Sequence, residues 1–408
     1  MQFPRQSLAG PLVAVMGVII AALLVVPPIT SALGGSGTRV TGVSSQLLTG
    51  DVVTGVRGES AQKAVLTGGV NEGTGLNPVI PFLVEAPLTR QTAGAAVSTF
   101  VPPFSGYKEG LFYGPDTHAF NPSSIPSGEV RAVGSYETSS KAGVLNQGMV
   151  YLGPVSGSGG TWSTIDVPAD GKHVVGHTKA CRVSGSNCFV MDTIPHSTMG
   201  DLVVGDYDLN VGGAHRAVSA NAFIYNLRTH RWTLLKLGGS ASNGTTLYGI
   251  WQNGGERSPN YTLAGGTSVR QHPKVLQRAF LMNYNERTGT FGARRYFSYR
   301  NKPTLLTHFE GITGVPGGFN VVAQTANDQV GMGFIAVNRH GTFGSARWFA
   351  VGVRASSLCA GGCSFVTGNT VYRNQVMGIY IPDATNIPNT YLETFSAQSS
   401  QPKTPSTP

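Results

Sequence analysis

Four cysteines are the residues whose spacing points most directly to a chemistry. Cys181 lies close to Cys188 in the sequence, and Cys359 lies close to Cys363. Short-range pairs of this kind are typical of disulfides in exported chains, where each bond staples one loop. A zinc site is the alternative, but the histidines near the first pair are not at the spacings that zinc ligands require. The pattern therefore favours two disulfides.

Histidine is the second residue type that could bind a metal or transfer protons. The nine histidines are dispersed, and His173, His177 and His196 lie nearest to the first cysteine pair. Val-Val-Gly separates His173 from His177, which indicates a strand, where this spacing also places two side chains on one face. A satisfied or exposed histidine is the default for each of them. No metal ion and no other cofactor is predicted.

Carboxylates would be needed for the cleavage of glycosidic bonds, which requires an acid and a nucleophile or base about 5 to 9.5 Å apart. Asp51, Glu129 and Asp201 recur at one position of a repeat, each directly after a glycine. Acidic residues are ordinary in turns at such positions. No G-x-S-x-G nucleophile motif occurs in the chain either. The catalytic and ligand-binding residues therefore remain unknown from the sequence.

Basic residues exceed acidic ones, 29 to 20, which gives a net charge of +9. They are scattered, and Arg294 and Arg295 form the only adjacent pair. Because nucleic-acid binding proteins gather basic residues on a stripe, no nucleic-acid partner is predicted. Arg294, Arg295 and Arg347 occupy equivalent hairpins and could hold a carboxylate as a triad, but their small neighbours favour exposed turns.

Tryptophans could stack on sugar rings if they faced the loops. The four tryptophans lie inside predicted strands, where core packing is the stronger interpretation. They are Trp162, Trp232, Trp251 and Trp348.

The N-terminus carries the features of an export signal. Arg5 precedes an apolar stretch at residues 12–26, and small residues follow before the sequence becomes polar. A membrane anchor is the alternative, because the stretch is close to the length of a membrane-spanning helix. We therefore expect a signal peptide or anchor at residues 1–34 and a secreted or cell-surface protein. Any membrane contact would come through an uncleaved leader.

A repeat runs through the rest of the chain. Its most regular element is a short apolar strand that begins at residues 51, 129, 201, 261, 320 and 364. A strand rich in aromatic and β-branched residues follows it, then a third that opens with threonine and an aromatic. A fourth precedes the unit at residues 248–251 and 309–312, and more faintly at 39–43. Four short antiparallel strands per unit predict the blades of a β-propeller.

Glycine or alanine lies near the end of the regular strand, as at Gly55, Gly205, Gly265 and Ala323. Such a residue allows close approach between sheets, and a β-bulge explains it equally well. Residues 71–123, which are rich in Gly, Pro, Ser and Thr, are expected to form long loops around one or two strands, such as residues 80–84.

The composition and repeat together predict an all-β chain with about six four-stranded blades. Residues 172–177 also resemble the regular strand, so seven blades are the alternative, but the next regular strand follows too soon for a whole blade. An insertion is favoured there. The propeller would span residues 38–397, followed by a flexible tail at 398–408, and a monomer is expected. A β-helix or two β-sandwiches are the rival architectures.

The order of the strands resembles that of the HAF-type extracellular repeat proteins of bacteria. Residues 201–237 carry the resemblance best, with the strands Val-Val-Gly, Ala-Phe-Ile-Tyr-Asn and Trp-Thr-Leu-Leu. The resemblance implies an exported, propeller-like protein that usually has no defined activity. It assigns no functional residue.

A secreted or surface-exposed binding module is the function that this architecture favours, with carbohydrate or another cell-surface component as its ligand. A secreted polysaccharide hydrolase or lyase is the alternative from another class, and a structural cell-envelope protein is a third. Two or three acids lining the central funnel would favour the enzyme. A polar funnel without acids would favour binding.

Overall fold

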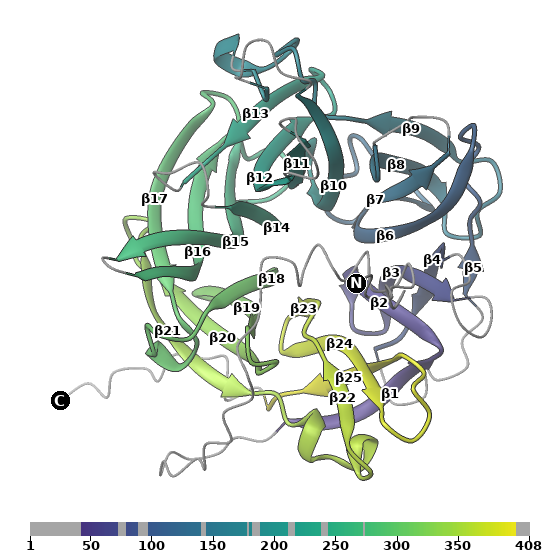
Figure 1. Ribbon diagram of the computed structural model, residues 1–408, viewed down its shortest axis with the longest axis vertical. Coiled ribbons are helices and arrows are strands. Elements are labelled where there is room, and N and C mark those ends of the chain that lie inside the picture. Colours follow the sequence, from purple (N-terminus) through teal and green to yellow (C-terminus); the bar gives the residue numbers. More distant parts are fainter. Residues whose placement is uncertain are drawn as a thin grey trace, which may run out of the picture.

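Six antiparallel sheets form a closed ring in the computed structural model (Figure 1). The structure describes residues 42–71, 79–88, 97–139, 144–177, 179–181, 188–210, 217–237, 244–271 and 274–396. Across these ranges the chain is all β apart from short 3₁₀ turns, which confirms the six-bladed β-propeller. The leader at residues 1–34 and the tail at 398–408 lie outside the described residues. No helix in the described part is long and apolar enough to cross a membrane.

Blades 1 to 3 follow one another along the chain, each ordered from the innermost strand outward. Blade 1 consists of β2 (Asp51–Ser60), β3 (Lys63–Asn71), β4 (Val79–Ala86) and β5 (Ser98–Thr99). Blade 2 consists of β6 (Tyr107–Thr117), β7 (Glu129–Thr138), β8 (Gln147–Pro154) and β9 (Thr161–Ile165). Blade 3 consists of β10 (Phe189–Met199), β11 (Leu202–Asn210), β12 (Ala217–Asn226) and β13 (Arg231–Leu235).

Blades 4 and 5 repeat this order. Blade 4 consists of β14 (Thr245–Asn253), β15 (Asn260–Gln271), β16 (Lys274–Asn285) and β17 (Thr290–Phe297). Blade 5 consists of β18 (Thr307–Val315), β19 (Gly318–Thr325), β20 (Val330–Val337) and β21 (Phe343–Ala350). Four 3₁₀ turns are described: η1 (Val175–His177), η2 (Tyr299–Asn301), η3 (Val353–Ala355) and η4 (Ser357–Cys359).

Blade 6 closes the ring by joining strands from the two ends of the chain. Its inner part is β22 (Cys363–Val366) and β23 (Thr370–Tyr372), followed by β24 (Gln375–Pro382), β25 (Asn389–Thr394) and, outermost, β1 (Val43–Thr49). β1 pairs antiparallel with β25 along its length. Of the residues predicted to open the first unit, 39–41 lie outside the described residues, and Val43 begins β1, which belongs to blade 6. The regular strands that begin at residues 51 and 364 are the innermost strands of blades 1 and 6. The repeat pattern predicted a strand before each of them, which would have made them second strands.

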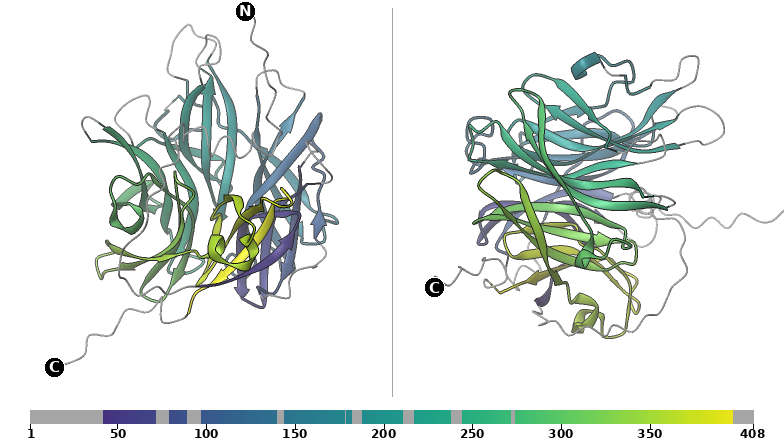
Figure 2. Two further views of the ribbon diagram at one scale, coloured as in Figure 1. Left: turned by 60° about the horizontal axis from the view of Figure 1, so that its bottom comes forward. Right: turned by 90° about the vertical axis from the view of Figure 1, so that its left-hand side faces the viewer.

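The strands of each blade run between two faces of the ring (Figure 2). We call the face at which the innermost strands begin the top face, and the opposite one, where they turn into the second strands, the bottom face. β6 of blade 2 was missed in the sequence, because residues 71–123 were expected to be mainly loop, whereas they contain β4, β5 and β6. Residues 175–177 form η1 and not a strand, so this stretch is an insertion, as favoured.

The hydrophobic core lies between neighbouring blades. One cluster joins Val204 and Ile224 of blade 3 to Leu247, Leu263 and Phe280 of blade 4. A sheet packed in this way is covered on both faces, which explains why its strands read as continuous apolar runs. Removing one large side chain from such a layer would loosen two blades at once, because each layer is shared.

A β-bulge recurs on the innermost strands. In blade 3 Pro195 pairs with Gly205 but Ser197 pairs with Val204, so His196 is left as the extra residue. The bulge lays a backbone carbonyl over the second strand, and a Cβ on Gly205 would collide with the Ile194 carbonyl oxygen. Of the two explanations for the small residue of the regular strand, the bulge is therefore the correct one here.

The same register shift is present in four other blades. Each time one residue of the innermost strand is left without a partner on the second strand. These extra residues are Thr54, Tyr113, Tyr248 and Glu310. Glycines lie under the bulge carbonyls at Gly68, Gly134 and Gly265, and a Cβ on any of them would collide with the carbonyl. Blade 5 has Ala323 at this position, opposite Phe309.

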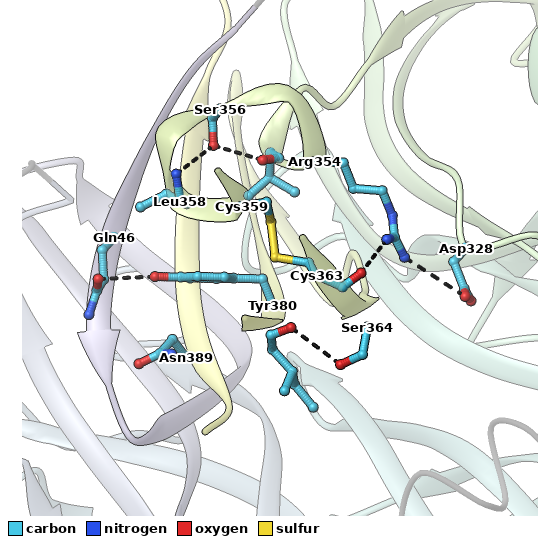
Figure 3. Close-up of a disulfide and its surroundings, with 12 residues drawn as sticks. Gln46, Asp328, Arg354, Ser356, Leu358, Cys359, Cys363, Ser364, Tyr380 and Asn389 are labelled. Carbon is cyan, nitrogen blue, oxygen red and sulfur yellow. Dashed lines mark hydrogen bonds and ion pairs between the residues drawn. A yellow bond between two sulfur atoms is a disulfide. The ribbon is translucent and has the colours of Figure 1, made fainter. Parts of the chain in front are cut away.

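Both predicted cysteine pairs are bonded in the structure. Cys181 and Cys188 have Cα atoms 5.8 Å apart, and those of Cys359 and Cys363 are 5.3 Å apart. Figure 3 shows the second disulfide where the chain turns into β22, with Arg354 donating to the Cys363 carbonyl oxygen at 2.7 Å. The bond thus fixes the start of the blade that closes the ring. Two disulfides are compatible with an extracytoplasmic location.

Candidate functional site

The extra residues of the bulges line one pocket on the axis of the ring. Its wall includes Thr54, Tyr113, His196, Tyr248 and Glu310, and Thr367 and Asn369 from the segment between β22 and β23. All six blades therefore contribute to it. About 100 Å³ is open to the centres of water molecules, which is room for several waters or one small polar group. Bulges often re-aim side chains toward a site in this way.

Four rings stack around one side of this pocket, from four successive blades. The ring centroids of Tyr113 and His196 are 4.7 Å apart, and those of His196 and Tyr248 are 3.8 Å apart. His308 of blade 5 continues the stack, with its centroid 4.4 Å from that of Tyr248. Burial raises the pKa of the Tyr248 hydroxyl well above its usual value, and the carboxylates nearby add to this. Tyr248 is therefore a neutral hydrogen-bond donor at any ordinary pH.

Each imidazole of the stack contacts a carboxylate. His196 Nε2 lies 2.7 Å from Asp206 Oδ1, and both side chains are almost fully buried. His308 Nδ1 lies 3.1 Å from Glu310 Oε1, while its Nε2 contacts the Thr246 hydroxyl. Neither ring N–H points straight at its carboxylate oxygen. These contacts orient the two rings and give each an acidic neighbour, as in acid–base sites.

A pair of glutamates on blade 2, the blade that also carries Tyr113, lines the pocket as well. Glu109 on β6 is directly opposite Glu137 on β7, and both line the pocket. Burial, and secondly the charge of Glu137, raise the pKa of Glu109 to about 7. The Val79 backbone N–H donates to Glu109 Oε2 at 3.4 Å. At neutral pH Glu109 can thus supply a proton, whereas an ordinary glutamate cannot.

Three aspartates lie behind the rings on β10 and β11. Asp192 pairs with Asp208 in the strand register, and Asp206 is two residues away on the face shared with Asp208. Burial raises the pKa of Asp192 to about 6. Burial, and then the charges of Asp206 and Asp192, raise that of Asp208 to about 8. No group of three metal-ligating side chains is placed to hold an ion anywhere in the described ranges.

Buried oxygens of this cluster lack aligned hydrogen-bond partners within the described part of the chain. They are Glu109 Oε1, Asp192 Oδ2, both carboxylate oxygens of Asp206, and Asp208 Oδ1. Leaving buried polar atoms unsatisfied is unfavourable, so they concentrate where function requires them. The acids are thus a candidate site rather than a structural ion cluster.

Arg57 forms the floor of the pocket. Its side chain is 4% exposed and donates to the Ile250 carbonyl oxygen at 3.5 Å. Its guanidinium carbon lies 5.2 Å from the centre of the Trp251 ring and 6.0 Å from that of Phe120. Two rings and a cation therefore lie below the pocket, on the side of the bottom face.

The carboxylates singled out in the sequence do not come together. Glu129 and Asp201 are at the bottom face, where Asp201 forms an ion pair with Arg228 at 3.1 Å. Asp51 is at the top face of blade 1, and burial raises its pKa to about 6. The preceding glycines all have positive φ angles, at Gly50, Gly128 and Gly200. This agrees with their interpretation as turn residues.

The other predicted side chains lie away from the pocket, with one exception. Arg294 and Arg295 are on β17 and Arg347 is on β21, the outermost strands, where each packs over an aromatic ring. His173 is exposed, and the side chain of His177 lies outside the described residues. His196, considered in the sequence only as a metal ligand, is the histidine that reaches the pocket.

The tryptophans pack into the protein. Trp232 is 5% exposed, and Trp162 packs on Phe112 and Tyr151 with centroid distances of 5.7 and 4.9 Å. Trp348 packs edge-on against Tyr299 at 5.3 Å. Only Trp251, between Arg57 and a second hollow on the bottom face, combines packing with access to a concave surface.

Sequence reasoning missed the pocket residues, although a signal was present. Asp206 and Asp208 interrupt an apolar strand at alternate positions, which places two acids on one buried face. The small residue of the regular strand marks the bulge, and the residue left over opposite it points to the axis. Reading that position in each unit would have found Tyr113, His196, Tyr248 and Glu310.

Comparisons with known proteins give similarity of fold only. No family model matches the chain, and no curated protein matches it. Similar solved structures include "YCF48 bound to D1 peptide", at 8% identity and a TM-score of 0.34, covering 89% of this chain and 100% of that one. The mannose phosphorylase MPT-4 from Leishmania mexicana has 13% identity and a TM-score of 0.37, with 76% and 93% covered. The GH43_1 enzyme from Xanthomonas citri complexed with xylotriose has 12% identity and a TM-score of 0.34, with 75% and 94% covered.

Proposed function

We propose that the chain is an exported hydrolase that cleaves a glycosidic bond at the end of a saccharide held in the axial pocket. One observation carries this proposal. Glu109 of blade 2 and Glu310 of blade 5 line the same pocket from blades on opposite sides of the six-blade ring. Two carboxyl groups that flank a bound sugar are the requirement for this reaction.

The surrounding residues fit the two roles. Glu109, with its pKa raised to about 7, donates a proton to the leaving oxygen. Glu310, held by His308 at 3.1 Å, supplies the second carboxylate. Tyr248 donates a hydrogen bond to a sugar hydroxyl, and His196 packs its ring against that of Tyr248. The pocket has room for one small polar group, which suits the terminal part of a saccharide rather than a long chain.

The proposal includes export of the chain from the cytoplasm and its membership of the HAF-type repeat proteins. Two disulfides are compatible with an extracellular location, and the apolar stretch at residues 12–26 fits a secretory signal. Membership of the HAF-type repeat proteins stays a prediction that rests on the strand motifs alone. A carbohydrate ligand suits a protein outside the cytoplasm, where polysaccharides are abundant.

The test is an activity screen of the purified chain on aryl glycosides and oligosaccharides. Glu109→Gln should lower kcat by about 10² to 10⁴-fold on any substrate that is cleaved, because an amide cannot donate the proton. Activity of the unaltered chain should fall as the pH rises above about 7, where Glu109 loses its proton. Glu129→Gln, on the same blade but at the bottom face, is the matched control and should keep full activity. Equal activity of the two variants would overturn the assignment.

Binding without turnover is the second candidate. The burial of the acids favours it, since Asp206 and Glu109 are 0% and 5% exposed. In that case sugars bind and Glu109→Gln weakens binding, but no product forms. Absence of both binding and cleavage would favour the structural cell-envelope role.

A further inference from the structure

A groove on the bottom face, between blades 4 and 5, is separate from the axial pocket. It has a volume of about 830 Å³ and is lined from Trp251 on β14 to Thr290 and Gly292 on β17. Its other wall is the hairpin between β18 and β19, from Gly314 to Phe319. Crossing four strands at their usual spacing gives a length of about 14 Å, enough for about three sugar residues.

None of the residues that line this groove carries a charge. The chain as a whole has 49 Lys, Arg, Asp and Glu residues and a net charge of +9. A surface groove of this size that is lined by no charged residue therefore differs from the rest of the surface. Four asparagines, several glycines and aromatic side chains line it instead. The asparagines are Asn253, Asn260, Asn283 and Asn285. Such a surface offers hydrogen bonds but no ion pair.

The asparagines are held in fixed orientations by the protein. Asn253 donates to the Thr262 hydroxyl at 3.0 Å, and Thr262 donates to Asn283 Oδ1 at 3.3 Å. Asn283 donates to the Gly341 carbonyl oxygen at 2.8 Å, which ties blade 4 to blade 5 across the groove. An amide has two donor and two acceptor positions, so each keeps capacity for a ligand. A rigid row of amides needs little ordering when a ligand binds.

Trp251 forms the inner end of the groove. Its ring packs against the guanidinium of Arg57 and against Phe120, whose ring centroid lies 5.7 Å away. Gly314 leaves room for it, since a Cβ there would collide with the indole. A large, immobile aromatic next to amides is the combination on which sugar rings stack while their hydroxyls bond.

We infer that this groove binds a neutral oligosaccharide of about three residues, independently of the axial pocket. Uncharged sugars match a lining with many hydrogen-bonding groups and no charge. Acidic or amino sugars do not, because their charges would lose water without gaining a partner.

Isothermal titration with neutral hexaoses of glucose, xylose and galactose tests the inference. Thr290→Arg places bulk and charge in the groove from an exposed position and should weaken binding at least tenfold. Thr161→Arg, at the matching exposed position of blade 2, is the control and should bind like the unaltered chain. Glu109→Gln should also leave this binding unchanged, which separates the groove from the axial pocket.

Four results would overturn the inference. One is the absence of binding to every neutral hexaose. Another is equal affinity of Thr290→Arg and the unaltered chain. A third is tighter binding of hexa-uronates or of neutral peptides than of the neutral sugars. A loss of binding confined to Glu109→Gln would assign the sugars to the axial pocket instead, and so would also contradict a separate groove site.

Discussion

The two ends of the ring axis bury charges in opposite ways. Near the bottom face, Asp116 lies between Arg57 and Arg131, and its carboxylate accepts backbone N–H bonds from Thr117 at 2.9 Å and Gly200 at 3.0 Å. Toward the top face, acids gather near two histidines and Lys108, and within the described residues several of their oxygens lack aligned partners. We call the bottom cluster balanced, because its acid faces arginines, and it joins neighbouring blades. The top cluster is unbalanced, and a ligand would complete it.

This difference has a structural cause. Arg131 donates to the carbonyl oxygens of Gly200 and Ser124, so the bottom cluster fastens blade 2 to the turn of blade 3. At the top, Glu109, Asp192, Asp206 and Asp208 lie within strands β6, β10 and β11, whose residues are paired with the neighbouring strand. Few backbone N–H groups therefore remain free to donate to these carboxylates. The same kind of residue is therefore structural at one end and available at the other.

The largest expected effect comes from breaking the balanced end. Asp116→Ala leaves Arg57 and Arg131 buried without their carboxylate and should lower the free energy of unfolding by about 3–5 kcal/mol at pH 7.5. Urea unfolding monitored by tryptophan fluorescence measures this. Asp170→Ala removes an exposed acid from a surface pair with Lys172 and should leave the unfolding midpoint unchanged. Identical midpoints for the two variants would show that the bottom cluster does not hold the ring.

The acids of the top end should make stability depend on pH in an unusual direction. The pKa values of Glu109 and Asp208 are raised to about 7 and about 8, above those of the unfolded chain. The folded state therefore binds more protons, and the stabilisation is complete below about pH 4 and is lost as the pH rises to about 8. Asp192 and Asp116, each raised to about 6, act in the same direction.

Asp208→Asn is the variant that isolates this effect. It replaces a carboxyl crowded by two other acids with a neutral amide, and should raise the free energy of unfolding by about 1–3 kcal/mol at pH 9 but change it little at pH 4. Melting temperatures from pH 4 to 9 measure both chains. A melting temperature of the unaltered chain that does not fall toward pH 9 would contradict the unbalanced charge at the top.

The sequence predicted the blades in the middle of the chain better than the blade that closes the ring. Blades 4 and 5 could be read in full, because all four of their strands carry the repeating pattern, whereas the innermost strand of blade 3, β10, was missed. The closing blade could not be read in full, since β1 and β25 are joined only by hydrogen bonds between distant segments. A pattern such as Asp-Val-Val at residue 51 shows a buried strand, but not which of two positions in the sheet the strand fills.

The site was hidden for a related reason. His196 and Glu310 are separated by more than a hundred residues, and only ring closure brings them to one axis. Their local patterns look like ordinary strands, because a bulge changes pairing and not composition. The glycine under the bulge was visible at Gly205 and Gly265, yet a glycine permits close approach as well as a bulge. Deciding between these needed the register of the neighbouring strand.

The smallest expected effects concern the turn residues at the bottom face. Gly128 has a φ of +82° and nothing within 4 Å of a Cβ built on it, so Gly128→Ala should destabilise the protein by about 1 kcal/mol through backbone strain alone. Glu129→Gln, one residue later, should change stability by less than about 0.5 kcal/mol. Urea unfolding of both variants measures the contrast. A larger loss in Glu129→Gln than in Gly128→Ala would mean that the recurring acid, and not the turn, is what the repeat preserves at this face. The bottom face would then hold unbalanced acids too, and the distinction between the two ends would fail.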